Sequence, residues 1–201
     1  MSLPGFFQDV PPLVLEDPLA AILGAATGGL LEYRYADAVG LAGHSCPTVA
    51  GAWLVARRGL AALYPQGTPR RGGLRVELRA AQEEGTAGVV AAVLGLITGA
   101  AGPGGFKGLG GAQSRRNLLL HSADIPAEVR MTRLDTGDTV LLDYHPEQVP
   151  PDPALAPLMA RVVGGTAEAG ERAEFARLWQ DRVRRLLLEQ GDDPELVVVR
   201  R

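Results

Sequence analysis

The sequence of 201 residues contains only one cysteine, Cys46. A single thiol cannot form a disulfide within the chain, and it cannot supply the ligands of a structural zinc site built on four cysteines or on two cysteines and two histidines. An iron–sulfur cluster ligated within one chain is excluded for the same reason. Disulfide chemistry is therefore no part of this protein, and a reducing cytoplasm is its expected compartment.

Lysine is almost absent too, because every basic residue except Lys107 is an arginine. Asp and Glu number 23 against 20 Lys and Arg, which gives a net charge of −3 and a pI of about 5.6. Such a chain has no broad positive field for a phosphate backbone, so we expect no nucleic-acid partner.

A long, uniformly apolar run is also missing. Residues 85–106 carry no charge and are long enough by count to cross a bilayer, but only residues 89–97 are strongly apolar and the rest are mainly Gly, Ala and Pro. A buried helix of a globular protein explains this composition better. Residues 1–12 lack the basic region followed by an apolar core that is typical of a signal peptide. We therefore expect a soluble protein with no membrane partner.

The sequence does contain alternating helical and extended patterns, of a length that suits one globular domain with an appendage. Asp17 and Pro18 predict a helix start, as N-cap and first helical residue. Residues 135–138, Asp-Thr-Gly-Asp, predict a hairpin turn. The predicted helices of this part of the chain are 18–27, 46–64 and 85–97, and the predicted strands are 30–35, 74–80, 118–121, 128–134 and 139–144.

A proline-rich stretch divides the chain, because five prolines fall within residues 146–157. This composition favours an extended linker over a packed element. We therefore divide the chain into a core, residues 1–150, and an extension, residues 151–201, made of the linker and a C-terminal helical part. Within the extension, residues 171–190 show the apolar stripe of an amphipathic helix that buttresses the core or forms a dimer contact, and residues 196–199 predict a closing strand.

The strongest chemical signal is the run Gly-His-Ser-Cys-Pro at residues 43–47. In an extended segment residues i and i+2 point to the same side, so the imidazole of His44 and the thiol of Cys46 face one point in space. Pro47 places Cys46 at the N-cap of the following helix, where the positive end of the helix dipole favours a thiolate. This pair suits metal ligation or nucleophilic attack. The structural alternative is a buried, inert Cys46 beside a hydrogen-bonded core histidine.

The run DAVGLAGHSCPTVAGAW at residues 37–53, with ITGA at residues 97–100 and a glycine-rich loop after it, resembles the FmdE family, named for one of the subunits of formylmethanofuran dehydrogenase. The resemblance covers about residues 15–150 and is most specific in the Gly-His-x-Cys-Pro box. It implies an α/β (α+β) core in which a mixed or largely antiparallel sheet packs against helices. It also implies a metal site, usually zinc, with His44 and Cys46 as ligands.

The chain departs from the family at one ligand position. Typical members carry a second cysteine at the start of the helix before the Thr-Gly pair, and the corresponding position here is near Val89. Because zinc takes four ligands, we expect Asp37 first and Glu84 next to complete the site, although carboxylates of this kind are also common on a solvated surface. The other candidates are a water molecule, a side chain from a second copy of the chain, and the side chains of Glu83, His121 and His145.

A glycine-rich loop is the second functional feature, because seven of the thirteen residues 99–111 are glycine. Such a loop presents backbone amides to an anion or lets a ligand approach the backbone closely. Lys107 is followed by glycine rather than by Ser or Thr, so the loop is no Walker A motif. We expect a lid or wall beside the metal site, with Lys107 holding a small anionic ligand. The alternative is a flexible connector.

Three hypotheses of function follow. The first is a metal-binding, FmdE-like homodimer that is accessory to a molybdenum or tungsten enzyme or takes part in one-carbon metabolism, an association that rests on the resemblance alone. The second is a metal- or thiol-dependent enzyme in which His44 and Cys46 act on a small anionic substrate. The third is a carrier module for a metal or cofactor. The sequence leaves open whether the protein is an enzyme.

Overall fold

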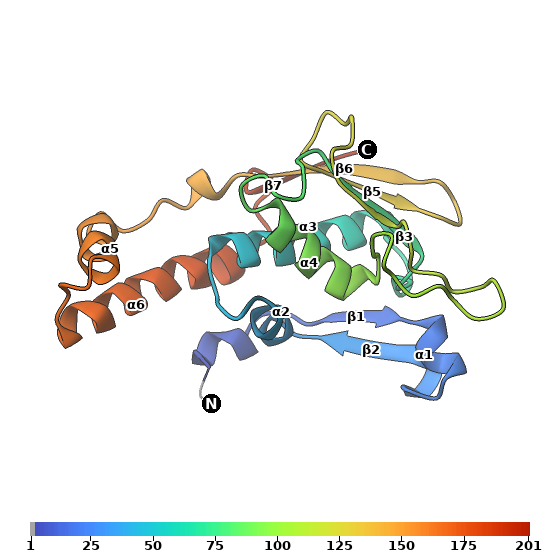
Figure 1. The fold of residues 1–201 in the computed structure, drawn as a ribbon, viewed down its shortest axis with the longest axis horizontal. Helices are drawn as coiled ribbons and strands as arrows, with labels where there is room; N and C mark the ends of the chain where they lie inside the picture. Colours follow the sequence, from blue (N-terminus) through green and yellow to red (C-terminus); the bar gives the residue numbers. More distant parts are fainter. Residues whose placement is uncertain (1–2) are drawn as a thin grey trace.

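One outer layer of the molecule is a five-stranded sheet with the strand order β4-β3-β5-β6-β7 (Figure 1). The computed structural model describes residues 3–201. β3 and β4 are parallel and the other neighbours are antiparallel. Parallel neighbours require a crossover, which helix α4 and the glycine-rich loop provide between β3 and β4. The strands are β3 (Leu74–Leu78), β4 (Leu119–Leu120), β5 (Val129–Arg133), β6 (Thr139–Tyr144) and β7 (Val197–Arg200).

Two helices form the middle layer, and a small hairpin layer covers them on the side away from the sheet (Figure 1). The helices are α3 (Pro47–Leu63) and α4 (Ala87–Thr98). The hairpin layer consists of the antiparallel strands β1 (Leu13–Glu16) and β2 (Leu30–Tyr33), together with α2 (Tyr35–Ala42). The fold is therefore α+β, with a largely antiparallel sheet packed against helices, and the predicted fold class is confirmed.

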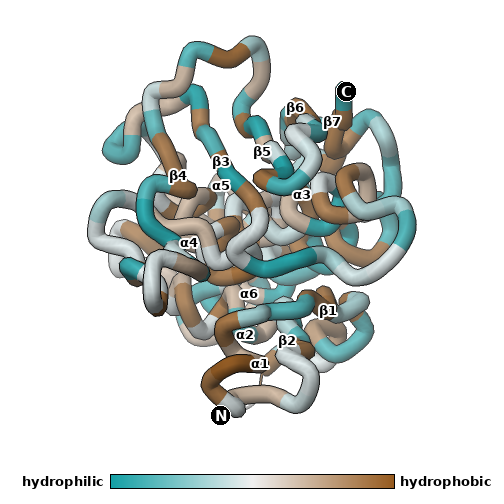
Figure 2. Tube along the Cα trace, turned by 90° about the vertical axis from the view of Figure 1, so that its right-hand side faces the viewer, coloured by the Kyte–Doolittle hydropathy of each residue, from teal (hydrophilic) through white to brown (hydrophobic). Residues whose placement is uncertain are grey.

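Helix α3 is the centre of the core. Every residue from 49 to 56 is buried, so this helix is covered on all sides rather than along one stripe. Two glycines bring it close to the sheet, because a Cβ on Gly51 would lie 2.2 Å from the ring of Tyr144 and a Cβ on Gly59 would lie 2.6 Å from the sulfur of Met131. Figure 2 shows hydrophobic residues along α3 and α4, and hydrophilic stretches in the loops that surround them.

A buried ion cluster joins the layers at one end of the molecule. Asp17 follows β1, and its Oδ1 accepts hydrogen bonds from the Leu19 amide (2.9 Å) at the start of α1 (Pro18–Ile22) and from Nη2 of Arg115 (2.6 Å). Its Oδ2 accepts from Nη1 of Arg71 (2.9 Å), and Nη2 of the same arginine donates to the Leu96 carbonyl (3.0 Å) near the end of α4. The hairpin layer, the segment before β3 and the end of the glycine-rich loop therefore meet at one carboxylate.

Glycines make room for this cluster. A Cβ on Gly72 would lie only 1.2 Å from Nη1 of Arg115, and one on Gly99 would lie 3.0 Å from the same atom. Both glycines have positive φ angles, 74° and 75°, which other residues rarely adopt. The Thr-Gly pair of residues 98–99 thus ends α4 against the buried arginine.

Several local predictions are confirmed. Asp17 is the N-cap of α1 with Pro18 as first helical residue, Cys46 is the N-cap of α3, and residues 135–138 connect the antiparallel strands β5 and β6. The predicted helix over 18–27 is too long, however, because α1 ends at Ile22 and Gly24 takes a left-handed conformation (φ 68°). Within residues 3–201 no helix is long and apolar enough to cross a membrane.

Three elements do not appear among the sequence predictions. β1 has only four residues and follows two prolines, and α2 begins at Tyr35, which the pattern assigns to a strand. α5 (Leu155–Val163) begins within the predicted proline-rich linker, residues 146–157, and extends beyond it. Pro157 is the third residue of α5, where a backbone N–H has no helical partner in any case, so this proline starts the helix without breaking it.

The C-terminal segment returns to the core. Beyond α5, helix α6 (Ala169–Arg184) and the turn after it bury Val183, Leu186 and Leu187 in the same apolar core as α3. β7 then pairs with β6 at the edge of the main sheet. Figure 1 shows α5 and the first half of α6 projecting from the body as a helical hairpin. Residues 151–201 therefore combine a projecting part with a strand and helix end that belong to the core.

The first prediction concerns the buried ion cluster. The substitution Asp17→Asn keeps a residue type that caps helices well, but it removes the negative charge between the buried guanidinium group of Arg115 and the partly exposed one of Arg71. We expect the free energy of unfolding to fall by about 3 kcal/mol, because removing one partner leaves the other charge buried and uncompensated. Urea denaturation at neutral pH measures the loss. Glu174→Gln breaks the exposed ion pair with Arg177 and serves as a control with little change.

The pH dependence of this loss tests its electrostatic origin. Burial opposes ionisation of Asp17, but the hydrogen bond from Arg71 and the charge of Arg115 outweigh it, and the pKa of this carboxyl lies below its ordinary value of 3.8. The carboxylate therefore stabilises the fold above that ordinary value, and the contribution is lost as the pH falls through the lowered pKa. The difference between wild type and Asp17→Asn should shrink below about pH 4. A constant difference in acid would contradict this account.

Candidate functional site

The Gly-His-Ser-Cys-Pro box forms the short connection between α2 and α3. Gly43 ends α2 in the left-handed conformation (φ 74°), and Cys46 has the extended backbone of an N-cap residue (φ −150°, ψ 170°). His44 is exposed, whereas Ser45 and Cys46 are buried. The expected position of the cysteine at the helix start is confirmed, and His44 is no core histidine.

One ring nitrogen of His44 has a fixed role. Nδ1 lies 2.9 Å from the carbonyl oxygen of Ala42. A carbonyl only accepts hydrogen bonds, so Nδ1 carries a proton in this contact, and Nε2 is the ring nitrogen that is left for another partner. Histidines that bind metals are commonly held in this way, with the second ring N–H donated to a backbone carbonyl. The exposed imidazole is therefore oriented, with Nε2 as the ring nitrogen that this contact leaves available to a metal.

Tyrosine side chains from α2 and from the end of β6 form hydrogen bonds with the residues on both sides of Cys46. The hydroxyl of Tyr35 on α2 lies 3.0 Å from Oγ of Ser45, and the hydroxyl of Tyr144 at the end of β6 donates to the Pro47 carbonyl (3.0 Å). Burial raises the pKa of both tyrosines far above the ordinary value of 10, so their hydroxyl groups stay protonated. The cysteine is thereby fixed between two hydrogen-bonded neighbours.

Helix α6 adds two further hydrogen bonds to the box. Nε1 of Trp179 and Nε2 of Gln180 both donate to the carbonyl of Ser45, at 3.0 and 3.1 Å. The sulfur of Cys46 makes no capping hydrogen bond with the amides of α3. The amphipathic helix predicted from the C-terminal sequence thus buttresses the box. The sulfur of Cys46 is not engaged in capping α3.

The expected carboxylate ligands have other partners. Oδ2 of Asp37 accepts a hydrogen bond from the Arg34 amide (2.7 Å) and caps α2, and Oε2 of Glu84 accepts from the Ala81 amide (3.2 Å) ahead of α4. Throughout residues 3–201 no three His, Cys, Asp or Glu side chains are grouped closely enough to hold a metal ion. Neither carboxylate therefore forms such a group with His44 and Cys46 in the described residues, and the completion of a metal site stays a prediction.

The remaining candidates are also placed elsewhere. His145 pairs with Glu147 through Nδ1 (2.9 Å), and Nδ1 of His121 is buried with no hydrogen-bond partner in the described structure. Lys107 is exposed on the glycine-rich loop. That loop is more ordered than a simple connector, because the Arg115 amide donates to the Phe106 carbonyl across it (2.8 Å).

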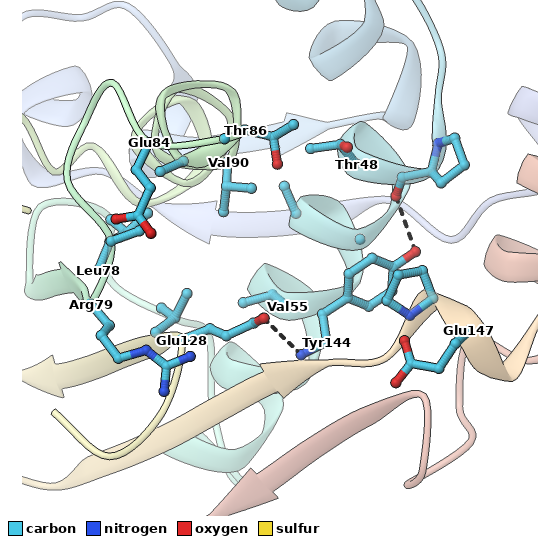
Figure 3. A pocket seen from close by; sticks show the side chains of 18 residues that line it. Thr48, Val55, Leu78, Arg79, Glu84, Thr86, Val90, Glu128, Tyr144 and Glu147 are labelled. Carbon is cyan, nitrogen blue, oxygen red and sulfur yellow. Dashed lines mark hydrogen bonds between the residues drawn. The ribbon is translucent and has the colours of Figure 1, made fainter.

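A pocket of about 760 Å³ opens beside the box (Figure 3). Its walls come from the first turns of α3 and α4, the ends of β3 and β6, and the start of β5. Pro47 and Thr48 line it, so the residue directly after Cys46 belongs to both features. Among the predicted site residues only Glu84 is part of this lining. In the sequence, only the small residues at the starts of the two helices indicate a pocket here. They do not indicate which strands form its other walls.

No protein-family model, curated protein or solved structure matches this chain. The resemblance to the FmdE family therefore rests on residues 37–53 and 97–100, and the metal site that it implies stays a prediction.

The second prediction tests the support of the box by α6. Trp179→Phe removes one of two donors to the Ser45 carbonyl and should lower the free energy of unfolding by about 1 kcal/mol. Gln180→Leu alone should cost less, because it also removes a buried side-chain oxygen that lacks a partner. In the double variant the buried carbonyl loses both donors, so the loss measured by urea denaturation should exceed the sum of the two single losses. Simple additivity would contradict a shared acceptor.

Proposed function

We propose that the protein is an FmdE-like metal-binding protein in which His44 and Cys46 hold a zinc ion or another divalent transition metal. The observation that carries this proposal is the hydrogen bond from Nδ1 of His44 to the Ala42 carbonyl. This hydrogen bond leaves Nε2 as the ring nitrogen that can bind a metal, and the histidine lies two residues before a cysteine with extended backbone. Nitrogen and sulfur donors at this spacing match the ligand preference of zinc.

The position of the cysteine supports the same proposal. Cys46 begins a helix of seventeen residues, and the positive end of its dipole favours negative charge on a nearby sulfur. A metal ligand must be the thiolate. The hydrogen bonds to Ser45 and Pro47 hold this sulfur in place before any metal arrives, which reduces the ordering cost of binding.

The remaining ligands must come from outside this pair. Zinc takes four ligands and one chain supplies two, so water, a small anionic ligand or a second copy of the chain would complete the coordination. Open positions are typical of a catalytic or transfer site rather than a structural one. The expected form is a homodimer in the cytoplasm, and the FmdE resemblance suggests a role accessory to a molybdenum or tungsten enzyme or to one-carbon metabolism. The redox step itself is not assigned to this chain.

The third prediction is the metal content. Protein purified without chelators from zinc-supplemented cells should contain close to one metal ion per chain by elemental analysis. His44→Ala and Cys46→Ala should each lose it, because neither residue alone can hold the ion. His145→Ala removes a histidine of another segment and should keep the metal, as should Asp37→Asn. Circular dichroism confirms that each variant is folded. Metal-free wild type, or full metal in both site variants, would exclude the site.

A thiol-dependent enzyme is the second candidate, and it is favoured by one observation. Pro47, the residue after Cys46, lines the large pocket, so a substrate held there would lie beside the cysteine. In such an enzyme Cys46 is the nucleophile and His44 the base. In this enzyme Lys107 contacts a small anionic ligand. If Lys107→Ala binds that ligand with unchanged affinity, this role of Lys107 is excluded.

The fourth prediction separates these two functions. Iodoacetamide reports on one site only, because the chain has a single cysteine. If Cys46 ligates zinc, its alkylation should be slow in the zinc-loaded protein and faster after removal of the metal with a chelator. A thiol that reacts rapidly at neutral pH with and without zinc favours the enzyme. A thiol that is inert in both states indicates a structural, buried cysteine.

A further inference from the structure

We propose that the pocket between the starts of α3 and α4 binds a small organic cation, namely a primary amine on an apolar body. The pocket volume of about 760 Å³ lies within the range of sites that enclose small molecules. Neither His44 nor Cys46 lines the pocket, so this proposal is independent of the metal site.

The floor of the pocket is apolar. Side chains from both central helices and from two strands form this floor. A ligand that binds there buries part of its surface against apolar side chains, so that part of the ligand should itself be apolar. Gly51 and Ala52 keep the wall of α3 low, and the ring of Tyr144 packs directly over Gly51. The apolar part of the lining includes Val55, Leu78, Val90 and Val129.

The rim of the pocket is negative. Glu84, Glu128 and Glu147 line it together with one basic residue, Arg79 (Figure 3). Glu147 is paired with His145, but within residues 3–201 no ion pair neutralises Glu84 or Glu128. Each of these two carboxylates accepts one backbone hydrogen bond through Oε2, from Ala81 and from Tyr144 respectively, and keeps Oε1 for a ligand.

Two other ligand classes fit this lining less well. A metal ion needs converging ligands, and the described residues contain no group of three acidic, His or Cys side chains close enough to hold one. An anion would find one basic side chain on the lining, Arg79, among the three glutamates Glu84, Glu128 and Glu147. At the start of α4, the amides of Ala87, Val89 and Val90 already donate to carbonyls of residues 84 and 86. An amine on an apolar body matches both parts of the pocket, since its apolar body can pack on the floor and its positive charge can lie near the glutamates of the rim.

The experiment uses three probes of one shape and different charge: 3-phenylpropylamine, 3-phenylpropan-1-ol and 3-phenylpropanoate. Each is titrated into the full chain at neutral pH, and the methyl signals of valine are followed by NMR. The amine should shift the signals of Val55 and Val90 in a saturable manner. Its affinity should exceed that of the alcohol by about fivefold, as one or two exposed ion pairs allow, and the carboxylate should bind weakest.

Variants locate the binding and identify the charges. The double variant Glu84→Gln, Glu128→Gln should reduce the affinity for the amine to that of the alcohol, because glutamine keeps an oxygen for the backbone hydrogen bonds but no charge. Glu83→Gln removes a neighbouring carboxylate outside the pocket and is the matched control, with no expected change. Thr86→Trp should block all three probes. Thr86 is exposed and makes no capping hydrogen bond, so this change leaves the fold intact.

Three outcomes would overturn the proposal. They are tighter binding of the carboxylate than of the amine, an amine affinity that the double glutamine variant does not change, and the absence of a shift at Val55 and Val90 with every probe at millimolar concentration. Repeating the amine titration on His44→Ala should give the wild-type affinity. The metal content of the double glutamine variant should equal that of the wild type, so failure of the pocket and failure of the metal site are told apart.

Discussion

The buried carboxylate of Asp17 is the contact on which the arrangement of the layers depends. It caps α1 and accepts hydrogen bonds from Arg71 and Arg115, and both of its oxygen atoms are engaged. Without it the buried guanidinium group of Arg115 would have no counter-charge and would lie near the like charge of Arg71, at a high cost in free energy. Gly72 leaves the space that Arg115 fills. The hairpin layer, the start of β3 and the glycine-rich loop are thereby held against the end of α4.

At the opposite end of the central helices, the start of α3 connects two features with different chemistry. The box places an oriented imidazole and a sulfur before the first turn, and Tyr144, Trp179 and Gln180 fix its backbone from β6 and α6. The pocket begins one residue later, at Pro47, and its charged rim comes from other segments. The metal site and the amine site that we propose are therefore neighbours that use separate side chains.

Local signals predicted the elements whose start is marked by a side chain or a turn. Asp17 with Pro18, Cys46 with Pro47 and the turn at residues 135–138 all lie where the sequence puts them, because these signals act within a few residues. The prediction of a linker up to Pro157 was wrong at its end, because Pro157 lies in the first turn of α5. A proline at such a position cannot be told from a linker proline by composition. The completion of the metal site by Asp37 is also an inference from closeness in sequence and stays a prediction, and in the structure this carboxylate caps α2.

The sequence by itself determined the succession of most helices and strands of the core and the start of the central helix, since these follow from periodicity and capping. Only the tertiary structure decided which distant residues meet. Arg115 pairs with Asp17, Trp179 reaches the carbonyl of Ser45, and Glu128 comes to the same pocket as Glu84. Each of these contacts depends on how helices and strands pack over long separations in the chain, and a pattern that repeats every two to four residues carries no information about that packing.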